Sequence, residues 1–148
     1  MTFAGLIEAL GKRLEIEIED AGGAAAVEID GTDVVLQDAG DILLLRAEVG
    51  EIPEGGKAEI LASAMKANFL YQGTGGATLA VNPADGMLHI HKYNWMERID
   101  AETVLEELDK LADTASAWRN ILADYSPGAV AADDGLTRSL EDPGFMQV

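Results

Sequence analysis

The sequence contains no cysteine, so no disulfide bond can stabilise the fold, and this absence suits a reducing compartment. Basic residues are also few: 10 Lys and Arg stand against 27 Asp and Glu, and the formal net charge is -17. A charge of this size repels phosphate backbones and anionic lipid surfaces, which argues against nucleic acid as a partner. Apolar runs are short, so we expect no signal peptide, no membrane insertion and a cytoplasmic location.

Apolar residues make up 48% of the 148 positions, which is enough to form one compact domain. A folded chain of this length buries roughly 68 to 70% of its unfolded surface, so it needs neither a metal nor a disulfide for stability. Large apolar residues become rare after Tyr125, while acidic residues continue. We therefore expect a domain at residues 1–125 and an acidic, flexible tail at residues 126–148.

Three segments carry apolar residues at helical spacing. The first runs from Phe3 to Leu10, and we expect Gly11 to end it. The second covers about residues 57–71. The third is the longest and ends near residue 125; Asp100 is a good N-cap for it, because its carboxylate can accept the free N–H groups of the first turn.

Other segments show the alternation or the turn signals of strands. Residues 14–19 alternate Leu or Ile with Glu, which predicts a strand with one apolar and one acidic face. Asp30-Gly31 is a hairpin signal between two short apolar runs. Residues 42–49 predict a central strand that is covered on both faces, and a second hairpin is expected to join 77–81 to 87–93.

The expected order is a helix, three or four strands, a helix, two strands and a last helix. Hairpins join the strands without strand-helix-strand alternation, which favours an antiparallel sheet with helices packed on it. With three strands in the first group, the fold class is α+β, an antiparallel twisted sheet with three helices in α-β-β-β-α-β-β-α order.

Residues with catalytic or metal-binding chemistry are sparse. His89 and His91 are the clearest metal candidates, because alternate strand residues project to one face, but two ligands are too few and no third stands at a recognisable spacing. The serines lack a G-x-S-x-G motif, and the many carboxylates are typical of a solvated face. We expect no catalytic residue, no cofactor and no metal, although a metal protein that uses the two histidines stays open as a hypothesis.

The apolar stripes outnumber what one small core obviously needs. One set can form the core while another contacts a partner protein, because exposed apolar patches generally mark interaction sites. The alternative is that all of them are core, since stripes at helical spacing usually are. The pattern alone does not decide between these two interpretations.

The order of these motifs resembles the class I type III secretion chaperones, the Tir chaperone family. The resemblance covers about residues 3–125 and includes the low pI of about 4.2. It is carried by the following motifs: Phe3-x-x-Leu6-Ile7-x-x-Leu10-Gly11, Leu14-x-Ile16, Asp30-Gly31, Ile42-Leu43-Leu44-Leu45 through Ile52-Pro53, Met65-x-Ala67-Asn68-Phe69, Gly75-Gly76-Ala77-x-Leu79, and Trp118-Arg119 in the closing helix.

The resemblance implies a non-enzymatic cytosolic homodimer. Such a dimer holds the N-terminal segment of a secreted effector in extended form and keeps it soluble and secretion-competent. The second helix would form the dimer interface through Ile60, Leu61, Ala64, Met65, Asn68 and Phe69, and strand 77–81 is a further candidate for it. Effector grooves would involve Phe3, Leu6, Ile7, Leu10, Leu14, Ile16 and Ile18. The alternative hypothesis is a regulatory or adaptor domain of the same fold that binds a folded partner.

Overall fold

The computed structural model describes residues 1–127, so the expected tail lies almost wholly outside the described residues. Its elements follow the expected order of helices and strands and confirm the α+β class. They are α1 (Phe3–Leu14), β1 (Ala24–Ile29), β2 (Thr32–Ala39), β3 (Ile42–Gly50), α2 (Lys57–Asn68), the short 3-10 helix η1 (Phe69–Tyr71), β4 (Thr78–Val81), β5 (Leu88–Trp95), the 3-10 helix η2 (Met96–Arg98) and α3 (Ala101–Ala123).

The five strands form one antiparallel sheet in the order β1-β2-β3-β5-β4. Strand β3 is central, as predicted. Asp30 and Gly31 turn the chain between β1 and β2 with φ angles of 49° and 82°. Two successive positive φ angles are those of a type I′ turn, which matches the twist of the flanking strands. Strands β4 and β5 also pair antiparallel, so both predicted hairpins are present.

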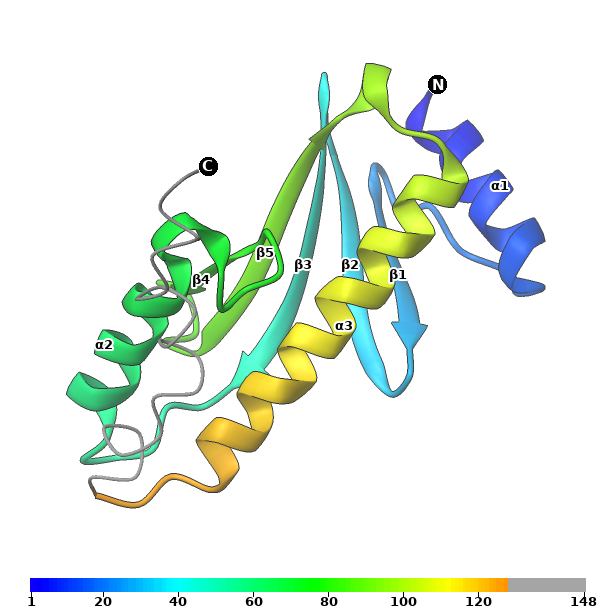
Figure 1. Ribbon diagram of the computed structural model, residues 1–148. Helices are drawn as coiled ribbons and strands as arrows, with labels where there is room; N and C mark the ends of the chain where they lie inside the picture. Colours follow the sequence, from blue (N-terminus) through cyan, green and yellow to red (C-terminus); the bar gives the residue numbers. More distant parts are fainter. Residues whose placement is uncertain (128–148) are drawn as a thin grey trace.

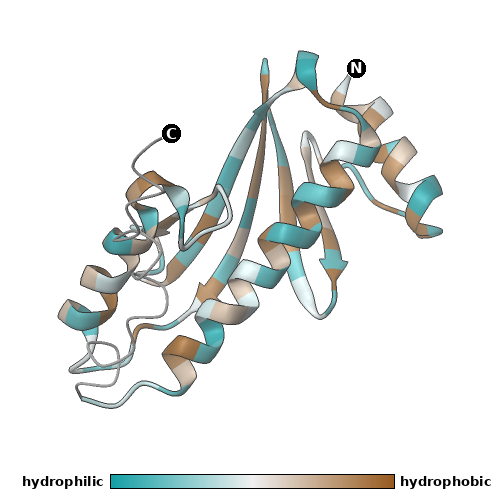
Figure 2. Ribbon diagram, viewed as in Figure 1, coloured by the Kyte–Doolittle hydropathy of each residue, from teal (hydrophilic) through white to brown (hydrophobic). Residues whose placement is uncertain are grey.

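Helix α3 crosses one face of the sheet, and α1 and α2 lie toward opposite ends of it (Figure 1). Asp100 caps α3 as predicted, accepting the backbone N–H of Thr103 at 2.8 Å. The apolar stripe of α3 faces the sheet in Figure 2 and is buried against it. Its fully buried members are Val104, Leu108, Leu111, Ala115 and Trp118.

The expectation that β3 is covered on both faces is wrong. Its burial alternates: Leu43, Leu45 and Ala47 are buried, whereas Arg46 and Glu48 on the opposite face are exposed. The helix-covered face takes the apolar side chains, and the charged ones lie on the open face. The continuous run of leucines before Arg46 concealed this alternation.

The predicted strand at residues 14–19 and the predicted stop at Gly11 are also wrong. Helix α1 continues through Gly11 to Leu14, and residues 15–20 pair with no strand among residues 1–127. The chain then folds back closely: the N–H of Ile16 donates to the carbonyl of Gly11 at 3.1 Å. A Cβ at position 11 would lie 2.9 Å from the carbonyl oxygen of Ile16, so glycine is needed for this close approach rather than to end the helix.

Candidate functional site

An open groove of about 560 Å³ lies between α1 and the returning segment 15–20. It exists because the chain reverses at Glu15, whose φ of 56° is left-handed and ends the helix. The groove is lined by Ala4, Ile7, Glu8, Gly11, Lys12, Glu15, Ile16, Glu17, Ile18 and Asp20. It is therefore an apolar channel with a charged rim.

The residues expected to bind an effector divide into two groups. Phe3, Leu6 and Leu10 are buried in the core, so they support α1 and offer no free surface. Leu14 is half-buried against the same core. The remaining three line the groove: Ile7 and Ile18 with a small exposed area, and Ile16 with 47% of its surface exposed.

The rim of the groove is mainly acidic. Lys12 pairs with Glu8 at 2.7 Å, and its hydrogen bond and charge lower the pKa of the Glu8 carboxyl. Glu15, Glu17 and Asp20 also line the groove. A ligand with apolar side chains for the channel and basic side chains for the rim would match this surface.

A second apolar surface lies on α2 and η1. Of the residues expected to form a dimer interface, Ile60 and Ala64 are buried in the core of the protomer and Leu61 is half-buried. Met65 and Phe69, in contrast, are 74% and 53% exposed. Met65 lies in the last turn of α2, and Phe69 follows four positions later as the first residue of η1.

The sequence reasoning missed two neighbours of Phe69. Leu70 and Tyr71 adopt positive φ angles of 52° and 61°, and both side chains are exposed. The signal was the unbroken apolar run from Phe69 to Tyr71, because three consecutive positions cannot all face one core from a helix. The exposed patch of Met65, Phe69, Leu70 and Tyr71 is called the α2 patch below.

Asn68, also expected at the dimer interface, instead joins α2 to the sheet. Its side chain donates to the carbonyl of Leu79 at 2.9 Å and accepts the N–H of Leu79 at 2.8 Å. These two bonds occupy the N–H and the carbonyl of Leu79 in β4, which is one edge strand of the sheet. The opposite edge strand, β1, pairs only with β2 among the described residues.

The two histidines line one hollow on the open face of the sheet, as their alternate spacing predicts, but their surroundings differ. His89 is buried beside Asp85 and Glu48, whereas His91 is exposed and lies outside that group. Asp85 and Glu48 were not foreseen as neighbours, because Asp85 lies in a turn and Glu48 on another strand.

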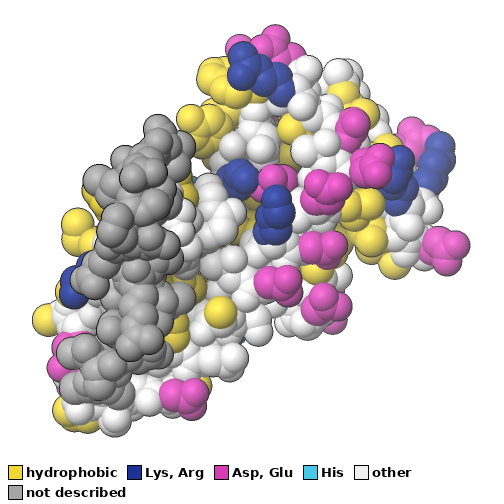
Figure 3. Space-filling model, viewed as in Figure 1, with side chains coloured by type: hydrophobic (Ala, Val, Ile, Leu, Met, Phe, Trp, Pro, Cys, Tyr) yellow, Lys and Arg dark blue, Asp and Glu magenta, His cyan; other side chains and the backbone are white. Residues whose placement is uncertain are grey.

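The outer surface of α3 is acidic, and Asp and Glu side chains spread along it in Figure 3. Glu102, Glu106, Asp109 and Asp113 are exposed there. No helix within residues 1–127 is long and apolar enough to cross a bilayer. The described surface thus combines an acidic helix with an apolar groove and an apolar patch, which is the surface of a protein-binding domain.

Comparison with known families identifies this domain more closely. The model of the Tir chaperone protein (CesT) family matches residues 5–119, and the chain belongs to this family. The resemblance inferred from the motif order is thereby confirmed. The comparison with curated proteins gives no significant match.

Solved structures show the same fold at low identity. A chain of the HopA1-SchA chaperone-effector complex matches with a TM-score of 0.65 and 20% identity, covering 80% of this chain and 93% of that one. A chain of the ExsC-ExsE complex matches with a TM-score of 0.64 and 18% identity, covering 82% of this chain and 94% of that one. A chain of the heterodimeric ExoU-SpcU complex from the type III secretion system of Pseudomonas aeruginosa matches with a TM-score of 0.66 and 16% identity. The match covers 78% of this chain and 97% of that one.

Proposed function

We propose that this chain is a cytoplasmic, non-enzymatic type III secretion chaperone. As a homodimer it holds the N-terminal segment of an effector in extended, secretion-competent form. The observation that carries the proposal is the exposed apolar groove of α1, on a chain that belongs to the Tir chaperone protein (CesT) family. The similar structures include one described as a chaperone-effector complex and one from a type III secretion system, which supports the same function.

The groove and the free edge of the sheet suit an unfolded chain. Apolar side chains of the effector would enter the channel formed by Ile7, Ile16 and Ile18, and backbone groups of the effector would pair with β1. Strand β4 is less suited to this role, because Asn68 already binds the backbone of Leu79. Ordering a flexible segment costs conformational entropy, so several contact regions are needed to offset it.

The α2 patch is the proposed dimer interface. Met65, Phe69, Leu70 and Tyr71 are all exposed and lie close together in the sequence. Such surfaces commonly mark protein-protein contacts, and a symmetric dimer buries the same patch on both copies. Ile60, Ala64 and Asn68 would support this interface from within the protomer instead of contacting the partner. A dimer also presents two α1 grooves to one effector.

Replacing Ile16 with aspartate tests the groove. We expect the dissociation constant for the effector to rise about tenfold or more, because apolar contact is lost and a carboxylate is desolvated in the channel. The melting temperature of the free protein should change little, since Ile16 is half exposed. The effector is the neighbouring open reading frame's product, co-expressed and purified with the chain, and binding is measured by calorimetry.

Ala117→Asp is the matched control, because it adds the same charge at an exposed position of α3. It should leave the affinity unchanged. Equal affinities of the Ile16→Asp variant and the parent would show that the groove is not the binding site. Failure of every neighbouring gene product to become soluble or exported with this chain would contradict the chaperone function itself.

A further inference from the structure

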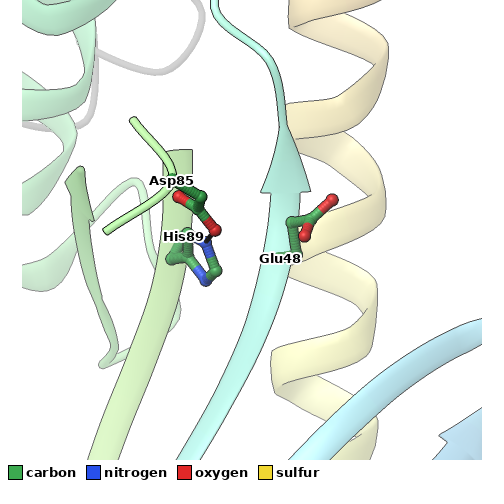
Figure 4. A group of neighbouring side chains, drawn as sticks. All are labelled: Glu48, Asp85 and His89. Atoms are coloured by element: carbon green, nitrogen blue, oxygen red, sulfur yellow. Dashed lines mark hydrogen bonds and ion pairs between the residues drawn. The ribbon is translucent and has the colours of Figure 1, made fainter. Parts of the chain in front are cut away.

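Three side chains with metal-binding atoms meet on the open face of the sheet, away from both apolar surfaces. The register of β3 and β5 places Glu48 opposite His89, and Asp85 comes from the turn that leads into β5. Figure 4 shows Asp85 and His89 together and Glu48 on the neighbouring strand β3, with its carboxylate turned away from them. One ligand atom of each lies within 4.8 Å of the other two.

Asp85 and His89 are already in contact and oriented. Oδ2 of Asp85 lies 3.0 Å from Nε2 of His89, while Oδ1 accepts the backbone N–H of Met87 at 2.8 Å. His89 is only 8% exposed, and the surrounding strands restrict its imidazole.

The third ligand is the carboxylate of Glu48. No hydrogen bond or ion pair of that carboxylate occurs among residues 1–127. Its backbone is fixed, because Nη2 of Arg119 donates to the Glu48 carbonyl at 2.6 Å. The same guanidinium donates to Oγ1 of Thr32 at 2.8 Å, and among residues 1–127 it makes no hydrogen bond to the Glu48 carboxylate.

We propose that Glu48, Asp85 and His89 bind one divalent transition-metal ion of the zinc class. One imidazole and two carboxylates form a ligand set that Zn²⁺ accepts at about 2.0 to 2.2 Å, with water at the remaining position. Tetrahedral ligands lie about 3.3 Å apart at such bond lengths, so the exposed Glu48 side chain must move inward by a rotamer change. The metal takes the lone pair of Nε2, and the imidazole proton then sits on Nδ1.

The composition makes this site easy to identify. The chain has two histidines and no cysteine, so a zinc site with a nitrogen ligand from a side chain must use His89 or His91. His91 lies two positions further along β5 and is exposed, which makes it a natural control. The bound ion would join β3 to the turn before β5, next to the register shift between Glu48 and Gly50.

The test is a calorimetric titration of the tag-free full chain with ZnCl2. We expect one Zn²⁺ per chain, an association constant at least about tenfold lower in His89→Ala and Asp85→Asn, and no change in His91→Ala. Asparagine keeps the acceptor for the Met87 N–H, so Asp85→Asn preserves the turn and separates ligand loss from misfolding. A rise in the melting temperature with Zn²⁺ should appear in the parent and in His91→Ala only.

Absence of saturable Zn²⁺ binding in the parent would overturn the proposal. An association constant for Zn²⁺ that falls equally in His91→Ala and His89→Ala would also overturn it. So would Mg²⁺ binding as tight as Zn²⁺ binding, because that would indicate a site with oxygen ligands only. The titration uses no effector, so its outcome is independent of the proposed chaperone function.

Discussion

Replacing Trp118 with alanine is expected to lower the free energy of unfolding by about 3 to 5 kcal/mol, the usual cost of truncating a fully buried tryptophan. Trp118 is 1% exposed, and its indole N–H donates to the carbonyl of Gly73 at 3.2 Å. The truncation therefore leaves both a cavity in the core and a carbonyl without its donor. Urea denaturation of the free protein, followed by far-UV circular dichroism, measures the loss.

The other tryptophan provides the control. Trp95 is 46% exposed at the end of β5 and contacts Tyr93 edge to face. Trp95→Ala should lower the free energy of unfolding clearly less than Trp118→Ala does, because nearly half of the Trp95 surface is already exposed and no buried cavity is left. An equal decrease in the free energy of unfolding in the two variants would show that Trp118 does not hold α3 to the sheet and to the loop before β4.

Replacing Phe69 with glutamate is expected to convert the proposed dimer into monomers. At a symmetric interface the substitution places two like charges near each other and removes two aromatic contacts. We expect the dimer dissociation constant to rise about a hundredfold or more. Light scattering coupled to gel filtration should then change from twice the chain mass to the chain mass of 15.7 kDa.

Tyr93→Glu is the matched control, because Tyr93 is an aromatic residue with similar exposure on the open sheet face. It should leave the dimer intact. A parent chain that is monomeric at all concentrations tested, or a Phe69→Glu variant with the mass of the parent dimer, would contradict the proposed interface. Phe69 is about half exposed in the protomer, so the fold should tolerate the change.

The parts of the fold predicted from sequence were those governed by local rules. The apolar stripe and Asp100 cap of α3 need only helical periodicity and capping, and both hairpins carry turn residues. The order of the elements followed from these. The first residue of strand β1 was harder to predict, because the strand begins with three alanines, which have weak strand preference.

The errors arose where tertiary contacts override local pattern. Residues 14–19 alternate like a strand, but in the described part of the chain they have no neighbouring strand to pair with and instead return along α1. Gly11 was interpreted as a helix stop, although its role is to allow the Ile16 backbone to approach. Neither the missing partner strand nor the close approach can be seen in a one-dimensional pattern.

The candidate site was predicted in part. Ile16 and Ile18 line an open groove, although the segment that carries them is not a strand, and their role in effector binding stays a prediction. Burial of Phe3 could not be foreseen, because periodicity identifies an apolar face without showing what covers it. Glu48 and His89 are 41 positions apart in sequence, and their proximity depends on the register between β3 and β5.

If this chain binds an unfolded effector segment along α1 and β1, amide hydrogen exchange of the purified complex should differ from that of the free chaperone at these elements. We expect slower exchange at residues 15–18 and along β1, with an effector N-terminal segment that is protected only while bound. Unchanged exchange in both regions, or a partner whose N-terminal segment is already folded when free, would contradict this mode of binding.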